Sequence, residues 1–225
     1  MLYKSQLLTE ARGSVGGSTF SRNAYGLYVR SRAKPVNPNT PYQQAVRNAL
    51  AAGHEAWLLL TENVRNTWNS YGENTTVPNK LGEPVHLTGR AHFIRQYVLR
   101  AQAGVAQITS APTVPGLTQL STLNVTATAA QLTVAFNDDD EWATHAGGFL
   151  AVFQSAGQSP GINYYRGPYR FVGIVAGAAT PPTSPQSFTH VLPVAAGDKI
   201  FVRAVAVSHA GRLSTEVFKS CTVAS

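Results

Sequence analysis

Ala111-Pro-Thr-Val-Pro-Gly116 marks the point at which the spacing of the hydrophobic residues changes. Before it, hydrophobic side chains recur every three or four positions, as on one face of an α-helix. After it, hydrophobic and polar residues alternate, as in a β-strand with one buried face. The prolines and the glycine favour an irregular connection. We therefore predict an α+β multidomain chain, in which a linker at 111–116 joins a helical domain at 41–110 to an antiparallel β-sandwich at 117–225.

The segments after the linker are short, rich in Val, Ile, Phe and Thr, and separated by turn residues. Six or seven strands at this spacing are typical of a β-sandwich. The predicted strands are 120–128, Leu132–Phe136, Phe149–Phe153, Arg170–Val175, Phe188–Leu192, Ile200–Val207 and Thr215–Val223.

Thr40-Pro-Tyr-Gln43 has the composition of a helix start. Thr40 can cap the helix, proline suits its first position, and Gln43 completes a capping box. Hydrophobic residues then keep a helical spacing in three segments. The predicted helices are 41–60, 62–71 and 88–105, with a loop at 73–87.

Residues 1–40 are predicted to form an extended docking arm. They are basic, rich in glycine and serine, and poor in residues that build a core. Val15–Phe20 and Tyr25–Arg30 have strand character and are expected to pair as a hairpin across 21–24, which needs a third strand or a packing surface to be stable. The arm residues predicted to contact a partner are Arg12, Phe20, Arg22, Tyr25, Leu27, Tyr28, Val29, Arg30 and Arg32.

The net charge of +7 resides in the first half of the chain, since residues 1–110 hold 12 Lys/Arg and 5 Asp/Glu, whereas residues 111–225 hold 6 of each. A basic half suits nucleic acid or an acidic protein surface. The cations are dispersed rather than clustered, which favours a protein partner. A helix-turn-helix at 41–71 that presents Asn63, Arg65, Asn66 and Asn69 keeps DNA binding as an alternative.

The sequence contains no clear motif for catalysis, a cofactor or a metal. It has no GxSxG nucleophile motif and no HExxH spacing among its six histidines. We therefore expect no enzyme activity, no catalytic residue, no cofactor and no metal site. Asp138-Asp-Asp-Glu141 is expected to be a solvated turn, with a bound cation or a basic partner as the alternative.

Neither a signal peptide nor an apolar segment of about 18 residues is recognisable in the sequence. The single Cys221 excludes an internal disulfide. We expect synthesis in a host cytoplasm and no contact with a membrane.

A second candidate binding site is a loop rich in tyrosine that follows Ser155–Gly161. Tyrosine and arginine are enriched where loops bind partners. The alternative is that the tyrosines cover one end of the sandwich. The loop residues predicted to contact a partner are Tyr164, Tyr165, Arg166 and Tyr169.

The last strands resemble a known family. Ile200-Phe-Val-Arg-Ala-Val-Ala-Val-Ser-His-Ala-Gly211, followed by Thr215–Val223, is similar to the last two strands of a fibronectin type III or Ig-like domain. Leu132–Phe136 occupies the place of that family's second strand. Phe136 stands where the family has tryptophan, and Ile200 stands where it has the corner tyrosine. The resemblance implies an Ig-like sandwich.

The front of the chain resembles small proteins from the structural-gene regions of tailed phages and prophages. The resemblance covers about residues 12–105 and is carried by four segments. It implies a part of a virion. The four segments are Gly13–Gly26, Lys34–Pro41, Gln43–Arg47 and Trp68–Tyr71.

These observations favour a non-enzymatic structural protein of a bacteriophage virion, anchored by its arm. A head-associated role, as a minor capsid, decoration or cement protein, is the first expectation, and a tail, collar or fibre-adaptor role is the alternative. DNA-binding and carbohydrate-binding modules remain further alternatives. The expected partners are other virion proteins and further copies of the same chain, rather than nucleic acid.

Overall fold

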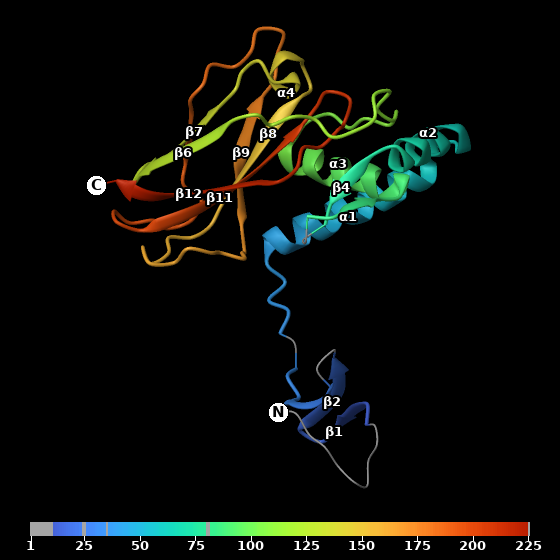
Figure 1. Cartoon of the computed structure of the whole chain (residues 1–225), viewed down its shortest axis with the longest axis vertical. Coiled ribbons are helices and arrows are strands. Elements are labelled where there is room, and N and C mark those ends of the chain that lie inside the picture. Colours follow the sequence, from blue (N-terminus) through green and yellow to red (C-terminus); the bar gives the residue numbers. More distant parts are fainter. Residues whose placement is uncertain (1–10, 24–25, 35, 80–81, 225) are drawn as a thin grey trace. The chain divides into compact units, whose positions relative to one another are not determined.

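The computed structural model of the chain describes residues 11–23, 26–34, 36–79 and 82–224, within two compact units, Met1–Pro41 and Tyr42–Ser225 (Figure 1). The described residues contain four helices, two small sheets and a mostly antiparallel sheet of seven strands, which confirms the α+β class. The helices and the large sheet, which the sequence analysis assigned to separate domains, lie together in the second unit.

The first unit is an antiparallel sheet of three strands, β1 (Gly13–Val15), β2 (Ser18–Asn23) and β3 (Gly26–Ser31), in that order. The predicted hairpin is therefore present as β2 and β3, with Phe20 opposite Val29. β2 continues beyond the predicted end at Phe20, to Asn23. The arm itself supplies the third strand that an isolated hairpin needs.

Three helices form the front of the second unit where the sequence predicts them: α1 (Pro41–Leu59), α2 (Glu62–Glu73) and α3 (Gly89–Ala103). They bury a cluster of aromatic rings that includes Trp57, Trp68, Tyr71 and Phe93. Between α2 and α3, the predicted loop at 73–87 contains the short paired strands β4 (Thr76–Pro78) and β5 (Pro84–His86).

Glycines allow α2 and α3 to approach closely. A Cβ atom on Gly89 would lie 2.4 Å from the carbonyl carbon of Trp68, and one on Gly72 would lie 2.5 Å from the carbonyl oxygen of Leu87. Real Cβ atoms do not approach backbone atoms so closely. Gly72 and Gly89 are therefore packing positions between the two helices.

The predicted linker is hydrogen-bonded to the rest of the second unit. Tyr71 donates a hydrogen bond from its hydroxyl to the carbonyl oxygen of Gly116 (2.9 Å), and the amide of Gly116 donates to Thr75 Oγ1 (3.0 Å). Farther along, the amide of Thr118 donates to the carbonyl oxygen of Leu213 (3.1 Å). Residues 111–118 are thus fastened to the helices and to the strands.

The large sheet has the order β10-β7-β6-β12-β11-β8-β9. All neighbours pair antiparallel except β6 and β12, which meet in a short parallel pairing of Ala127 with Val223 and Thr128 with Ala224. The predicted strands are confirmed, and only their ends shift. The strands are β6 (Leu123–Thr128), β7 (Gln131–Phe136), β8 (Phe149–Gln154), β9 (Arg170–Ala176), β10 (Gln186–Thr189), β11 (Lys199–Val207) and β12 (Val217–Ala224).

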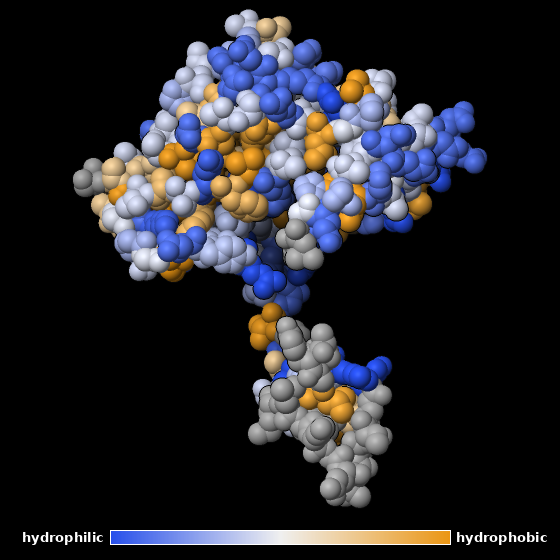
Figure 2. Space-filling view, viewed as in Figure 1, coloured by the Kyte–Doolittle hydropathy of each residue, from blue (hydrophilic) through white to orange (hydrophobic). Residues whose placement is uncertain are grey.

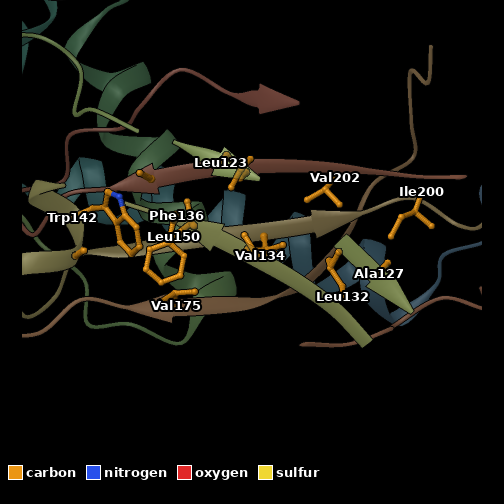
Figure 3. Close-up of a cluster of buried hydrophobic side chains, with 14 of the residues drawn as sticks. Leu123, Ala127, Leu132, Val134, Phe136, Trp142, Leu150, Val175, Ile200 and Val202 are labelled. Carbon is orange, nitrogen blue, oxygen red and sulfur yellow. The ribbon is translucent and has the colours of Figure 1, made fainter. Parts of the chain in front are cut away.

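The main core collects side chains from distant strands of this sheet (Figure 3). Leu132 and Val134 of β7 are fully buried together with Leu150 of β8 and Val202 of β11. Trp142 is also fully buried, and its ring centroid lies 5.2 Å from that of Phe136. Figure 2 shows hydrophobic side chains gathered over the strands on the face in view, whereas the side chains around α2 are mostly hydrophilic.

Trp142 belongs to α4 (Glu141–Thr144), a single turn that the sequence analysis did not predict. It follows the acidic run at 138–141, which is only partly the solvated turn that we expected. Asp140 is buried and accepts hydrogen bonds from the amide and the hydroxyl of Ser121 (3.0 and 2.7 Å). Glu141 pairs with Arg212, which is the main reason that its pKa is lowered.

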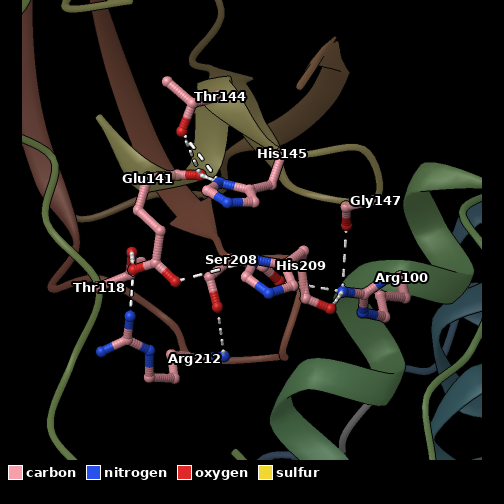
Figure 4. A network of polar contacts seen from close by, with 9 residues as sticks. All are labelled: Arg100, Thr118, Glu141, Thr144, His145, Gly147, Ser208, His209 and Arg212. Atoms are coloured by element: carbon pink, nitrogen blue, oxygen red, sulfur yellow. Dashed lines mark hydrogen bonds and ion pairs between the residues drawn. The ribbon is translucent and has the colours of Figure 1, made fainter. Parts of the chain in front are cut away.

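The guanidinium of Arg100 joins α3 to the loops of the large sheet (Figure 4). Its Nη1 donates to the carbonyl oxygen of Ala106 (3.0 Å), and its Nη2 lies 3.0–3.2 Å from the carbonyl oxygens of Gly147, Ser208 and His209. The side chain is 1% exposed. A buried cation is tolerated only where hydrogen-bond acceptors surround it, so these carbonyl groups must hold their places.

In the described ranges, none of the helices has both the length and the hydrophobicity that would let it cross a membrane.

Replacing Arg100 by methionine should lower the free energy of unfolding by about 3 kcal/mol, because four carbonyl groups would lose their buried donor. Urea denaturation followed by circular dichroism measures this change. Arg90→Met is the matched control, since Arg90 is exposed on the same helix. An Arg100→Met variant as stable as the control would show that this contact does not hold α3 to the sheet.

His92 should make the fold sensitive to mild acid. Burial is the main cause that lowers its pKa to about 4, and Arg95 adds to the effect. In the unfolded chain His92 therefore binds a proton near pH 6.5, whereas in the folded chain it does not, so the free energy of unfolding falls as the pH drops through this range. Between pH 7 and pH 5 the loss should be about 2 kcal/mol.

Urea denaturation at both pH values tests this dependence. His92→Phe retains an aromatic ring next to Tyr71 (5.0 Å between the native ring centroids) but has no proton to bind. The variant should lose about 2 kcal/mol less than the native chain between pH 7 and pH 5. Equal losses in both proteins would contradict a buried neutral His92.

Candidate functional site

The second unit contains a cleft of about 1030 Å³ between its helical part and its sheet. β4 and α3 contribute one wall, through Val77, Pro78 and Arg95. β11, β12 and the loop at 163–169 contribute the other. All four loop residues predicted from the sequence line this cleft: Tyr164, Tyr165, Arg166 and Tyr169.

Two hydrogen bonds within the tyrosine-rich loop hold it in shape. The hydroxyl of Tyr165 donates to the carbonyl oxygen of Pro168 (3.0 Å), and that of Tyr169 donates to the carbonyl oxygen of Tyr165 (3.1 Å). The two rings meet edge to face, with 5.3 Å between their centroids. Such a loop presents its side chains without first having to become ordered.

The strands extend this group of rings. The ring of Tyr165 stacks on Phe201 of β11 at 5.5 Å and 18°. The ring of Tyr169 lies 5.9 Å from that of Phe218 in β12. We call Tyr165, Tyr169, Phe201 and Phe218 the aromatic cluster. Phe218 remains 54% exposed, and the adjacent Tyr164 is 79% exposed, so two rings are open to a ligand.

Arg203 packs against the aromatic cluster. Its guanidinium lies 4.1 Å from the ring centroid of Phe153 and 5.9 Å from that of Tyr169. Nη1 also donates to Glu216 Oε1 at 3.1 Å, so the carboxylate of Glu216 already has a cationic partner. Burial, followed by the proximity of Tyr165, raises the pKa of Tyr169, which therefore stays a hydrogen-bond donor at neutral pH.

Two arginines in the cleft have no such partner. Arg95 of α3 and Arg166 of the loop line it, and neither side chain forms a hydrogen bond or an ion pair with another residue in the described ranges. Lys219 of β12 also borders the cleft, but it lies opposite the fully buried Val202 and therefore on the other face of the sheet from Phe218. Arg166 is exposed, whereas Arg95 is half-buried. Burial is the main cause that lowers the pKa of Arg95. The electrostatic influence of Glu216, followed by that of Tyr71, opposes this effect.

A smaller, more apolar hollow of about 280 Å³ shares Arg95 and Glu216 with the cleft. It lies between α1, α3 and β11, where Leu50, Val98 and Val205 line it. Leu50 is 44% exposed, so the hollow is open on the side of α1. Arg95 is therefore the residue at which the aromatic and the apolar regions meet.

The first unit gathers the arm residues onto two different faces. Residues opposite each other in the sheet share a face, so Phe20, Arg22, Leu27 and Val29 lie on one side, together with Val15. Tyr28 and Arg30 lie on the other side. We call the first side the apolar face of the arm. Arg12 precedes β1 and Arg32 follows β3, and Tyr25 lies outside the described residues.

The arm is also strongly cationic. Residues 11–40 contain five Lys or Arg and no Asp or Glu. The positive residues are Arg12, Arg22, Arg30, Arg32 and Lys34. In the described part of the arm, β1 and β3 are edge strands, with β2 between them. Edge strands are templates for pairing with another chain.

The sequence analysis found the tyrosines of the cleft but missed Arg95, Phe201, Phe218 and Lys219. Phe201 and Phe218 were assigned to strands, yet the analysis did not ask which face of a strand each occupies. Phe218 alternates with the hydrophobic residues of β12 that face the core, so its position on the outer face was a usable signal. Arg95 carried none, because the fold alone brings α3 to this loop.

The residues that the structure describes include no group of three His, Cys, Asp or Glu side chains arranged to hold a metal ion.

No protein-family model matches the chain, and no curated protein matches it. Solved structures with partial similarity include a family 76 glycoside hydrolase from a bovine Bacteroides thetaiotaomicron strain (13% identity, TM-score 0.33) and a beta-1,2-glucanase from Parabacteroides distasonis (16% identity, TM-score 0.29). The matches cover 47% and 51% of this chain, but only 20% and 14% of the two hydrolases.

The third fibronectin III domain of the human KIAA0343 protein is similar over 53% of this chain and 93% of its own, at 9% identity and a TM-score of 0.32. Because glycoside hydrolases are among the similar structures, the prediction that the chain is not an enzyme is contradicted, and we do not retain it. At these TM-scores the similarities assign no activity to the chain.

Proposed function

We propose that the chain is a structural subunit that its N-terminal arm anchors to a larger assembly. The observation that carries the proposal is the separate three-stranded sheet at 13–31. The third strand supports the hairpin, but a unit of about 40 residues usually needs a partner, a disulfide or a metal to be stable. A partner that covers its apolar face, or that adds a strand at β1 or β3, would supply the missing contacts.

The charge of the arm supports an acidic partner. Residues 11–40 contain five cations and no acid. The arm would therefore be repelled by the arm of a second copy and attracted to a negatively charged surface. We therefore infer docking onto an acidic face of a neighbouring protein, with several copies of the chain arranged around the same assembly. The dispersed arginines favour a protein surface over a nucleic acid.

The resemblance of residues 12–105 to structural proteins of tailed phages and prophages supports a virion as this assembly. Within a virion we favour a position on the head, as a minor capsid, decoration or cement protein. A tail, collar or fibre-adaptor position is the alternative.

We also infer that the seven-stranded sheet is a fibronectin type III or Ig-like β-sandwich. The shared core supports this inference, since β6 and β7 on one side and β8 and β11 on the other contribute to the same cluster. The contact between Trp142 and Phe136 supports the inference further. The family has a core tryptophan where this chain has Phe136, and here Trp142 supplies a tryptophan next to that position.

Removing residues 1–39 should abolish incorporation into particles while leaving the second unit folded. The cores of the second unit contain no arm residue, so its melting temperature should change by less than about 2 °C. Incorporation is measured by immunodetection of the chain in gradient-purified particles from a phage or prophage that carries the altered gene. Full incorporation of the shortened chain would show that the arm is not the anchor.

Two point variants with the same change of charge refine this experiment. Leu27→Asp places a carboxylate on the apolar face of the arm and should reduce incorporation about tenfold or more. Ser21→Asp is the matched control, because Ser21 lies on the opposite face, across from Tyr28. If the native chain itself is missing from purified particles, the virion role is wrong.

A further inference from the structure

We propose that the cleft of the second unit binds an acidic oligosaccharide, that is, a saccharide whose sugar units carry carboxylate groups. The inference uses no residue of the arm and does not depend on where the arm docks.

The aromatic part of the cleft suits the apolar faces of sugar rings. A sugar presents a face of C–H groups that packs on an aromatic ring. Tyr164 and Phe218 are the rings that remain exposed for this contact, and Phe218 rests against Tyr169. Because the aromatic cluster is already packed and the loop is already hydrogen-bonded, ordering these rings costs little on binding.

The charges of the cleft select for an anion. The side chains of Arg95 and Arg166 have no partner in the described ranges, and the one acid among the lining residues, Glu216, is paired with Arg203. An arginine that gains a carboxylate gains charge-assisted hydrogen bonds, which are the strong ones. The same charges exclude the basic arm of a second copy as the occupant.

The remaining lining of the cleft is polar. Asn163, Thr215 and Ser220 are exposed and offer amide and hydroxyl groups, which are the partners that sugar hydroxyls need. A volume of about 1030 Å³ is at the upper end for small-molecule sites, so several sugar units fit better than one.

Single-stranded nucleic acid is the main competing ligand, because it too combines rings with negative charge. Proteins that bind it follow the phosphate backbone with a track of cations. Here the two arginines come from two separate elements, α3 and the tyrosine-rich loop, which form different walls of the cleft. Convergence from separate walls suits isolated carboxylates better than a continuous backbone.

Isothermal titration of the full chain tests the proposal with oligosaccharides of galacturonate, alginate and hyaluronan and with sialyllactose. We expect at least one of them to bind. Its uncharged methyl ester should bind about tenfold more weakly or worse, because the carboxylate would lose its charge-assisted hydrogen bonds. An eight-residue oligothymidylate at the same salt concentration measures the competing ligand.

Variants locate the binding in the cleft. Arg95→Gln, Arg166→Gln and Phe218→Ala should each weaken binding about tenfold. Arg166 and Phe218 are exposed, so their variants should fold even if Arg95→Gln does not. Arg90→Gln and Leu59→Ala are the matched controls, since these exposed residues lie outside the cleft, and they should bind as the native chain does.

Three results would overturn the proposal. The first is that none of the acidic saccharides binds to the folded chain. The second is that Arg166→Gln and Phe218→Ala leave the affinity unchanged, which would place the binding elsewhere. The third is that the oligothymidylate binds more tightly than every saccharide, which would assign the cleft to single-stranded nucleic acid. Loss of particle incorporation in the arm variants would affect none of these outcomes.

Discussion

The buried guanidinium of Arg100 is the contact on which the arrangement of the second unit depends. A cation that is 1% exposed must be surrounded by acceptors, and three of its four acceptors are carbonyl groups in the loops around Gly147 and His209. α3 therefore cannot separate from the sheet without leaving either the charge or these carbonyl groups unsatisfied. Hydrophobic packing of Leu99 and Ala103 against Phe149 and Val207 adds to this tie, but packing alone would tolerate sliding.

The Arg100 contact also positions the two walls of the cleft. The cleft has Arg95 on α3 as one wall and Phe218 on β12 as the other, so its width depends on how the helix is fixed to the sheet. Tyr71 and Thr75 hold Gly116 and so fasten the segment between the helices and the strands as well. On our two proposals, the cleft would serve recognition and the arm would serve anchoring.

Much of the fold could be predicted from the sequence because its signals are local. The spacing of hydrophobic residues gave all three long helices and the seven strands, and Thr40-Pro41 gave the start of α1. Contacts between distant residues gave no such signal. Nothing near Arg100 indicates that its partners lie at 147 and 208, and a single turn such as α4 is too short for periodicity to reveal. For the same reason the tyrosines of the cleft could be found as a cluster in sequence, whereas Arg95 could not.

Hydrogen–deuterium exchange of the intact chain, followed by mass spectrometry of its peptides, tests most directly whether helices and sheet form one body. If Arg100 ties them together, the best-protected amides of α2 and α3 should open with the same free energy as those of β8 and β11, and all should respond equally to low concentrations of urea. Residues 11–34 should exchange independently of both. Helices that open several kcal/mol more easily than the sheet would contradict the account, because the cleft would then lie between two bodies that move apart.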